Sequence, residues 1–245
     1  MELIDRGMTY IAQTHRARTL DFLPKSLKMV EIGVFEGDYS AHLLKRADPS
    51  SLTLIDPWLQ HDDAAYARDT ANSKTSVQNA RYEKVKNRFK AECKSGQVKI
   101  VRDLSVPALA NLTGEMFDFA YVDAMHYEDA VLDDLNAISR CMHPDGLISG
   151  HDFAAHPLAR RKNFGVIQAV RRFCEATAYV PIVITNERWA SYYLAREGSP
   201  VASAFLTGLL ASDIPLSSFP ARLIGTVRQR SVSLRGEEKI ITEVC

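Results

Sequence analysis

The sequence predicts an α/β protein with a Rossmann-like sheet of seven strands and helices on both faces. From residue 28 onward, short β-rich apolar runs alternate with helical patterns, and such alternation is typical of a parallel sheet. The last two runs, 180–187 and 189–196, have almost nothing between them, so they must pair as an antiparallel hairpin. The 245 residues suit one α/β domain with a short appendage.

The elements follow one another in a regular order. Five parallel strands are expected at 28–34, 52–57, 98–103, 117–124 and 146–152, and the C-terminal antiparallel hairpin follows them. Helices are expected at 39–47, 75–95, 105–112, 127–142 and 164–178. In the second helix Tyr82, Val85, Phe89 and Cys93 share one face, which predicts that this face packs on the sheet.

Two further segments flank this domain, which we expect to span residues 28–196. Residues 1–27 are predicted to form an N-terminal helical segment, and residues 197–245 a C-terminal extension. The sequence leaves the role of the extension open between a dimerisation arm and a poorly ordered tail. The alternation in SVSLRGEEKIITEV (231–244) permits one added strand there.

Composition narrows the classes of function. Thirty basic residues balance thirty acidic ones, which argues against broad binding to nucleic acid. No run approaches the ~20 apolar residues of a membrane span, and the N-terminus has no apolar signal-peptide core. The four cysteines form no C-x-x-C pair, so we expect neither a zinc site nor a disulfide framework. A cytoplasmic protein is therefore expected.

The turn after the first strand predicts the kind of ligand. Residues 30–40 read VEIGVFEGDYS, whereas a dinucleotide-binding turn needs G-x-G-x-x-G. Counted from Gly33, the second and third glycines of such a pattern are missing, and Glu36 would repel a pyrophosphate. The turn therefore suits a cofactor that has no phosphate and carries a cationic part.

Polar residues also end the other parallel strands. Asp56, Asp103 and Asp123 end the second, third and fourth strands, and His151 and Asp152 end the fifth. The carboxyl ends of parallel strands lie at one edge of a sheet, where open α/β sheets bind ligands. Any one acid could be a helix cap, but their repetition indicates a binding site. An acid in the position of Asp56 can accept hydrogen bonds from ribose hydroxyls.

This order of motifs resembles the class I S-adenosylmethionine-dependent methyltransferases over residues ~28–196. The resemblance implies that S-adenosylmethionine is the cofactor, and its sulfonium agrees with an acidic turn. The cofactor-binding candidates are Glu31, Gly33, Gly37, Asp56, Asp103 and Asp123.

A narrower resemblance is to the macrocin O-methyltransferase-like group of small-molecule and glycan O-methyltransferases. It is carried by VEIGVFEGDYS, LIDPW, YVDAMHYEDAVLDDL and HPDGLISGHDF. It implies methyl transfer to a hydroxyl of a sugar or another small secondary metabolite. It also implies a divalent metal, such as Mg²⁺, on Asp123 and Asp152. His151 replaces one acid of that group's pattern, and a nitrogen ligand suits Mg²⁺ poorly.

Two ways of activating the acceptor hydroxyl stay open. Either His126 or His151 accepts its proton as a general base, or a metal lowers its pKa. The acceptor is expected to be a small molecule. Arg160, Arg161 and Lys162 would suit a nucleotide-linked or phosphorylated sugar. A homo-oligomer is compatible with the sequence.

Three rival functions remain. A nucleic-acid methyltransferase would need a basic, aromatic-rich face. A nicotinamide-dependent sugar oxidoreductase would need the missing glycine pattern. A non-enzymatic module of the same fold would have no need to keep Glu31, Asp56 and Asp103 together.

Overall fold

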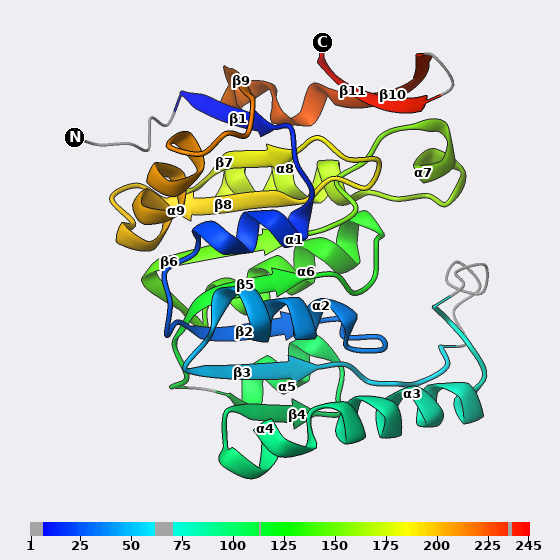
Figure 1. Ribbon diagram of the computed structural model, residues 1–245. Coiled ribbons are helices and arrows are strands. Elements are labelled where there is room, and N and C mark those ends of the chain that lie inside the picture. The colour runs from blue at the N-terminus through cyan, green and yellow to red at the C-terminus, as the bar shows by residue number, and fades with distance from the viewer. Residues whose placement is uncertain (1–6, 62–70, 113, 235–236) are drawn as a thin grey trace.

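A computed structural model describes residues 7–61, 71–112, 114–234 and 237–245. Its centre is a nine-stranded sheet with the strand order β4-β3-β2-β5-β6-β8-β7-β1-β9 (Figure 1). The seven predicted strands are β2 (Lys28–Ile32), β3 (Ser51–Ile55), β4 (Val98–Val101), β5 (Phe117–Val122), β6 (Met142–Gly150), β7 (Tyr179–Thr185) and β8 (Tyr192–Arg196). These seven strands are neighbours in the sheet, with no other strand between them. β8 runs antiparallel to both of its neighbours, β6 and β7.

The sheet has two more strands than predicted, and both come from the flanking segments. β1 (Met8–Ala12) pairs in parallel with β7, and β9 (Leu216–Pro220) pairs antiparallel with β1. The N-terminal segment is therefore not wholly helical as predicted, because among its described residues, 7–27, only α1 (Arg16–Thr19) and η1 (Leu20–Phe22) are helices. Pairing with β1 satisfies backbone groups of β7 that would otherwise lie at a sheet edge.

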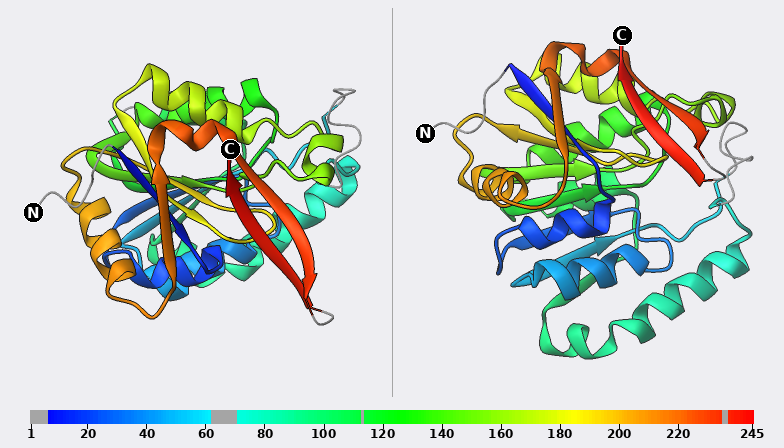
Figure 2. Two further views of the ribbon diagram at one scale, coloured as in Figure 1. Left: turned by 90° about the horizontal axis from the view of Figure 1, so that it is seen from above. Right: turned by 45° about the horizontal axis from the view of Figure 1, so that its top comes forward.

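Helices cover both faces of the sheet, as predicted (Figure 2). One face packs against α5 (Ser105–Asn111), α6 (Glu128–Ser139), α8 (Val166–Ala176) and η4 (Ala221–Thr226). The other face packs against η1, α2 (Asp38–His42), η2 (Leu43–Ala47), α3 (Thr75–Arg88) and α9 (Pro200–Leu210). α4 (Lys90–Ser95) continues from α3, and α7 (Pro157–Arg161) lies in the connection after β6. Within the described residues, no helix is long and apolar enough to cross a membrane.

The C-terminal extension packs on the domain. Besides α9 and β9 it forms a separate two-stranded sheet from β10 (Val227–Leu234) and β11 (Glu237–Val244), which we call the C-terminal hairpin. The buried side chain of Gln229 donates to the carbonyl of Phe153 at 2.9 Å and accepts from the amide of Ala155 at 3.0 Å. These bonds attach the C-terminal hairpin to the segment that follows β6.

The strand register places the predicted site residues at one edge. Ile32, the last residue of β2, pairs with Ile55 of β3 and Val122 of β5, and Val122 pairs with Gly150 of β6. The residue after each of these strands therefore emerges at the same level. The strand order also reverses between β2 and β5, and such a switch point opens a ligand crevice in α/β sheets.

Candidate functional site

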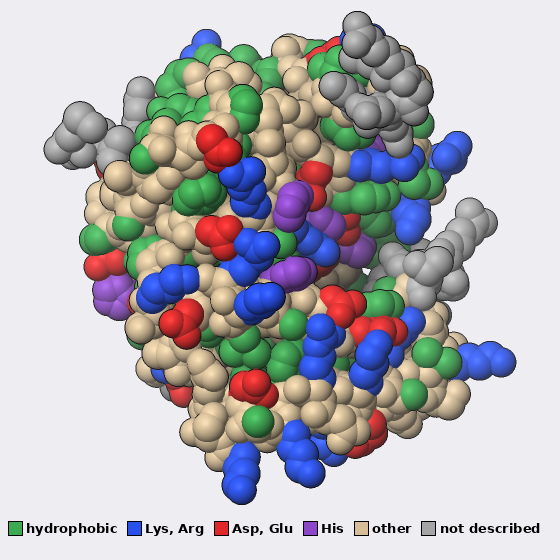
Figure 3. Space-filling view, viewed as in Figure 1, with side chains coloured by type: hydrophobic (Ala, Val, Ile, Leu, Met, Phe, Trp, Pro, Cys, Tyr) green, Lys and Arg blue, Asp and Glu red, His purple; other side chains and the backbone are tan. Residues whose placement is uncertain are grey.

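A cavity of about 580 Å³ lies at this edge, beyond the carboxyl ends of β2, β3, β5 and β6. Figure 3 shows acidic, basic and histidine side chains gathered around a hollow near the centre of this face. The volume is within the ~300–1,000 Å³ range of small-molecule sites. Of the predicted residues, Glu31, Gly33, Asp56, Asp123, His126, His151 and Asp152 line the cavity.

Gly33 forms the turn that brings the backbone of β2 against the end of β5. Its φ is +85°, and a Cβ there would lie 2.0 Å from the carbonyl oxygen of Asp123. Only glycine fits both constraints. Gly37, the other predicted cofactor glycine, does not line the cavity. It precedes α2 with φ +77°, and a Cβ there would lie 2.8 Å from the ring of Phe89, so the backbone conformation and the packing both favour glycine.

Asp56 holds the turn in place from the end of β3. Its Oδ2 accepts the amides of Val34 and Phe35, both at 2.9 Å, and its Oδ1 accepts the amide of Trp58 at 2.7 Å. Burial raises the pKa of Asp56, although these hydrogen bonds oppose the shift. A carboxylate has about four acceptor sites. Since three are used, roughly one remains for a ligand hydroxyl.

Glu31 supplies a carboxyl group from β2 that is only 1% exposed as a residue. Ser40 of α2 donates a hydrogen bond to its Oε2. Burial raises the pKa of Glu31 to about 8, and the hydrogen bond from Ser40 opposes this only in part. The group is therefore mostly protonated at neutral pH in the absence of a ligand.

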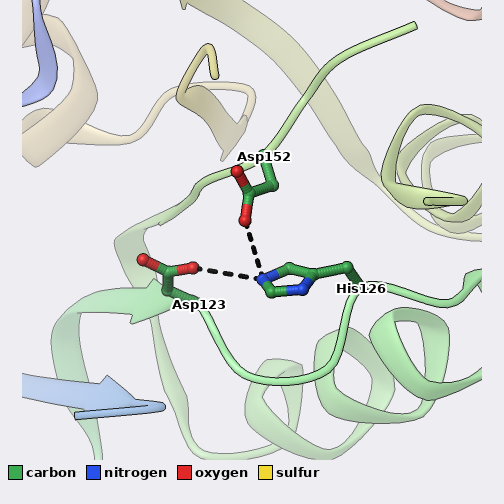
Figure 4. Close-up of side chains that lie close together, drawn as sticks. All are labelled: Asp123, His126 and Asp152. Carbon is green, nitrogen blue, oxygen red and sulfur yellow. Dashed lines mark ion pairs between the residues drawn. The ribbon is translucent and has the colours of Figure 1, made fainter. Parts of the chain in front are cut away.

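Asp123, His126 and Asp152 form a cluster on one side of the cavity (Figure 4). Nε2 of His126 lies 2.7 Å from Oδ2 of Asp152 and 3.5 Å from Oδ1 of Asp123. One ligand atom from each of the three residues lies within 4.8 Å of the others. Asp152 has a φ of +55°, a conformation that is costly for a non-glycine residue and is concentrated at functional sites.

His151 lies beside the same two carboxylates. Its Nδ1 is 3.4 Å from Oδ1 of Asp152 and 3.6 Å from Oδ2 of Asp123. The structure therefore brings both predicted bases to the cluster. The group whose ligand atoms lie within 4.8 Å of one another contains His126, whereas the resemblance places His151 beside Asp152 in the metal-binding pattern. The reason is that the chain after β5 returns His126 toward the end of β6, which residue spacing alone does not reveal.

The partners of Asp123 keep its carboxyl group ionised. Burial raises the pKa of Asp123, but its interactions with His151, His126 and Arg16 outweigh burial, and the net shift is downward. Nη1 of Arg16 donates to Oδ2 of Asp123 at 2.9 Å and to the Tyr121 hydroxyl at 2.6 Å. Asp123 is thus ionised and paired throughout the neutral range.

Arg16 is a site residue that the sequence reasoning missed. It comes from α1, outside the predicted domain, and its side chain is 30% exposed at the cavity. Its guanidinium also lies 4.9 Å from the centre of the Tyr39 ring. Among the described residues that line the cavity, Arg16 is the only lysine or arginine. A charged residue within a short N-terminal helix carries no motif by which it could have been found.

The lining of the cavity differs from the predicted set at other residues too. Asp103 follows β4 but does not line the cavity, whereas the next residues, Leu104 and Ser105, do. Asp134 of α6 lines the cavity and was not predicted, because it reads as an ordinary position in a helix. In the connection after β3, Trp58 is buried and His61 lines the cavity.

Comparisons with known proteins agree with this geometry. A family model described as a methyltransferase domain matches residues 30–153, about half of the chain. No curated protein sequence shows a significant match.

Solved structures show the same fold at low sequence identity. N-methyltransferase NodS from Bradyrhizobium japonicum WM9 is 14% identical, with a TM-score of 0.51 over 74% of this chain and 93% of that chain. A putative rRNA methylase from Clostridium thermocellum is 9% identical, with a TM-score of 0.51 over 75% and 94% of the two chains. Fibrillarin from Aeropyrum pernix, with natively bound S-adenosyl-L-methionine, is 9% identical, with a TM-score of 0.50 over 70% and 67%.

Proposed function

We propose that this chain, which belongs to the methyltransferase-domain family, transfers a methyl group from S-adenosylmethionine to a hydroxyl of a small molecule such as a sugar. The observation that carries the proposal is the position of the Asp123–His126–Asp152 cluster and His151 in the same cavity as the Glu31–Gly33 turn and Asp56. Groups that can activate a hydroxyl therefore face the space that the cofactor would occupy.

The cavity residues fit the charges of the cofactor. Asp56 retains an acceptor site for a ribose hydroxyl, and the surrounding carboxyl groups favour a cation such as a sulfonium. The cofactor's α-carboxylate needs a positive partner, and Arg16 is the lysine or arginine available to it among the described cavity residues. We therefore assign Arg16 to that carboxylate. Guanidinium groups suit carboxylates because they offer paired donors.

The histidines provide the acid–base chemistry. When bound, the cofactor supplies a methyl group on a sulfonium, and its transfer to oxygen leaves a neutral thioether. The hydroxyl proton must leave as the new C–O bond forms, and an imidazole can take it. We assign this step to His151, because Nε2 of His126 is already 2.7 Å from a carboxylate oxygen of Asp152. His126 then orients Asp152.

A divalent metal would fit Asp123, His126 and Asp152. Two carboxylates and one imidazole suit Mn²⁺, Fe²⁺ or Zn²⁺ better than Mg²⁺, which prefers an all-oxygen shell. A metal there would lower the pKa of a nearby hydroxyl. His151 would then still receive the proton.

The proposal is tested by calorimetry and by isotope transfer. We expect S-adenosylmethionine and S-adenosylhomocysteine to bind the wild-type protein at micromolar concentrations. With S-adenosylmethionine carrying a ¹³C-methyl group and a small-molecule extract as acceptor, the methyl carbon of the product should have the chemical shift of an O-methyl group. An N-methyl product would contradict hydroxyl specificity, and failure to bind either ligand would contradict the methyltransferase activity.

The assigned base is tested in the same assay. His151→Gln should lose methyl transfer and keep its affinity for S-adenosylhomocysteine. His143→Gln is the matched control, because His143 is an exposed histidine at the start of β6, away from the carboxyl edge. If His126→Gln loses activity while His151→Gln retains it, the assignment of the base must be reversed.

A further inference from the structure

A second, smaller cavity of about 170 Å³ lies beside α7 and the C-terminal hairpin. Figures 1 and 2 both show that hairpin next to α7. The segment after β6 contributes His156 and Arg161, the β7–β8 connection contributes Arg188, and the hairpin contributes Gln229 and Ser231. The volume is below the ~300 Å³ of sites for whole small molecules, so it suits one functional group of a ligand.

The lining of this second cavity is cationic. It includes Arg161 and Arg188 but no aspartate or glutamate. Both arginines are exposed, and no acidic side chain among the described residues forms a salt bridge with either. By contrast, the exposed Arg172 pairs with two acidic residues. Two arginines without carboxylate partners are typical of sites for phosphate groups.

Hydrogen bonds connect the segments that form the walls of the second cavity. The bonds of Gln229 to Phe153 and Ala155 fix the hairpin to the segment after β6. Nδ1 of His156 accepts the amide of Ala159 at 3.2 Å, which places the proton of the neutral ring on Nε2. The Asn186 side chain donates to the carbonyl of Ile240 at 3.1 Å, so the β7–β8 connection is tied to the same hairpin. A preformed site of this kind loses little entropy on binding.

A row of aromatic rings joins the second cavity to the catalytic cluster. The ring of His156 lies 4.5 Å from that of Trp189, Trp189 lies 5.2 Å from Phe164, and Phe164 lies 4.4 Å from His126, all between ring centres. Three ring contacts therefore separate the second cavity from the catalytic cluster. The segment that carries Arg161 also begins directly after Asp152, one of the cluster's carboxylates.

We propose that the second cavity binds a phosphate group of the methyl acceptor, as in a phosphorylated or nucleotide-linked sugar, while the acceptor hydroxyl lies at the Asp123–His126–Asp152 cluster. This inference rests on the proposed methyltransferase function. The two cavities have opposite charge, and the two proposed reactants, a cationic cofactor and an anionic acceptor, also have opposite charge. The acidic cavity attracts the cationic cofactor, and the basic cavity attracts the anionic acceptor.

Binding of inorganic pyrophosphate to the full chain tests the site. The protein is first saturated with S-adenosylhomocysteine, and pyrophosphate is titrated at constant ionic strength by calorimetry. We expect saturable binding to the wild type, with a loss of affinity of about tenfold or more for each arginine in Arg161→Gln and Arg188→Gln. Arg140→Gln is the matched control, because Arg140 is exposed at the C-terminus of α6 and should bind as the wild type does.

Several outcomes would overturn the inference. No pyrophosphate binding to the wild type, or equal binding to the double variant Arg161→Gln/Arg188→Gln, would remove the site. Affinity for S-adenosylhomocysteine should be unchanged in that variant. Unchanged affinity for S-adenosylhomocysteine shows that the double variant is folded. The same measurement separates failure of this inference from failure of the proposed function. The charge-conserving Arg161→Lys and Arg188→Lys should retain part of the affinity.

The source of the phosphate is tested by treating the acceptor. Methyl transfer to the small-molecule extract is measured before and after the extract is treated with a nucleotide pyrophosphatase, which cleaves the diphosphate of a nucleotide-linked sugar, together with alkaline phosphatase, which removes phosphate monoesters. Loss of transfer after treatment supports a phosphate on the acceptor. Equal transfer before and after treatment would overturn that assignment, and pyrophosphate binding would then indicate a site for a free phosphate ion.

Discussion

Replacing Arg16 by glutamine should weaken cofactor binding through one part of the cofactor only. The guanidinium is assigned to the α-carboxylate of the methionine moiety, and glutamine keeps much of the side chain's length while it removes the charge. S-adenosylhomocysteine contains that carboxylate. 5′-Methylthioadenosine contains the same nucleoside and thioether but lacks the amino-acid part. The two ligands therefore separate loss of the carboxylate contact from general damage to the cavity.

The size of the effect follows from the position of Arg16. Its side chain is 30% exposed and already donates to Tyr121 and Asp123, so solvent and these partners screen part of its charge. A hydrogen bond between charged groups contributes about 1.5–3 kcal/mol. Since each 1.4 kcal/mol is a factor of ten, we expect S-adenosylhomocysteine to bind about 10–100-fold more weakly. The affinity for 5′-methylthioadenosine should be almost unchanged.

Calorimetric titration of both ligands into wild type and variant measures this difference. Arg18→Gln is the control, because Arg18 lies on the same helix but pairs with Asp213 at the surface. Urea denaturation checks that Arg16→Gln remains folded. If both ligands lose affinity equally, Arg16 acts only by holding Asp123 and Tyr121. If neither loses affinity, the carboxylate lies elsewhere.

Three further predictions concern the turn, a buried acid and the metal. Gly33→Ala combines a left-handed φ with a clash against the carbonyl of Asp123, so it should cost about 2–5 kcal/mol in urea denaturation. Gly96→Ala has φ +83° but open space around it and should cost only about 1–2 kcal/mol; equal losses would show that the clash is relieved. Burial raises the pKa of Asp134 from 3.8 to about 6, so its contribution to stability is present below pH 3.8 and is lost as the pH rises through 6. Asp134→Asn should therefore be more stable than wild type at pH 8, by up to about 3 kcal/mol, and this advantage should disappear near pH 4; an advantage independent of pH would contradict the burial argument. Mn²⁺ should bind more tightly than Mg²⁺ in calorimetry and should lose its affinity in Asp152→Asn; preference for Mg²⁺ would contradict the assigned ligands.

Much of the fold could be predicted from local pattern alone. The strands β2, β3, β5 and β6 are mostly buried and appear in the sequence as largely apolar runs, because a parallel sheet is covered on both faces. β1 could not be predicted in this way, since MTYIA lies outside the alternation of strand and helix patterns that begins at residue 28. β9 could not either, because LSSFP contains two serines and a proline and joins the sheet only by pairing with β1. Both strands depend on a partner that is distant in the sequence.

Some residues of the candidate site could likewise be predicted from their position in the sequence, and others could not. Glu31, Gly33, Asp56, Asp123 and Asp152 were found because each lies within two residues of a strand's end, and the register of a parallel sheet brings such residues to one edge. Asp103 has the same position in sequence but lies off the cavity, since β4 is the outermost strand and the switch point is between β2 and β5.

The sequence by itself determined the seven strands from β2 to β8, the glycine turn and the acids at the strand ends, because these follow from local apolar pattern and from the fixed geometry of parallel strands. Only the tertiary structure decided that Arg16 enters the cavity, that His126 joins Asp123 and Asp152, and that the C-terminal hairpin forms the wall of a cationic cavity with Arg161 and Arg188. Each of these depends on side chains from segments far apart in the chain. Their contacts form only when those distant segments pack against each other, and the local sequence pattern of a single segment does not predict such packing.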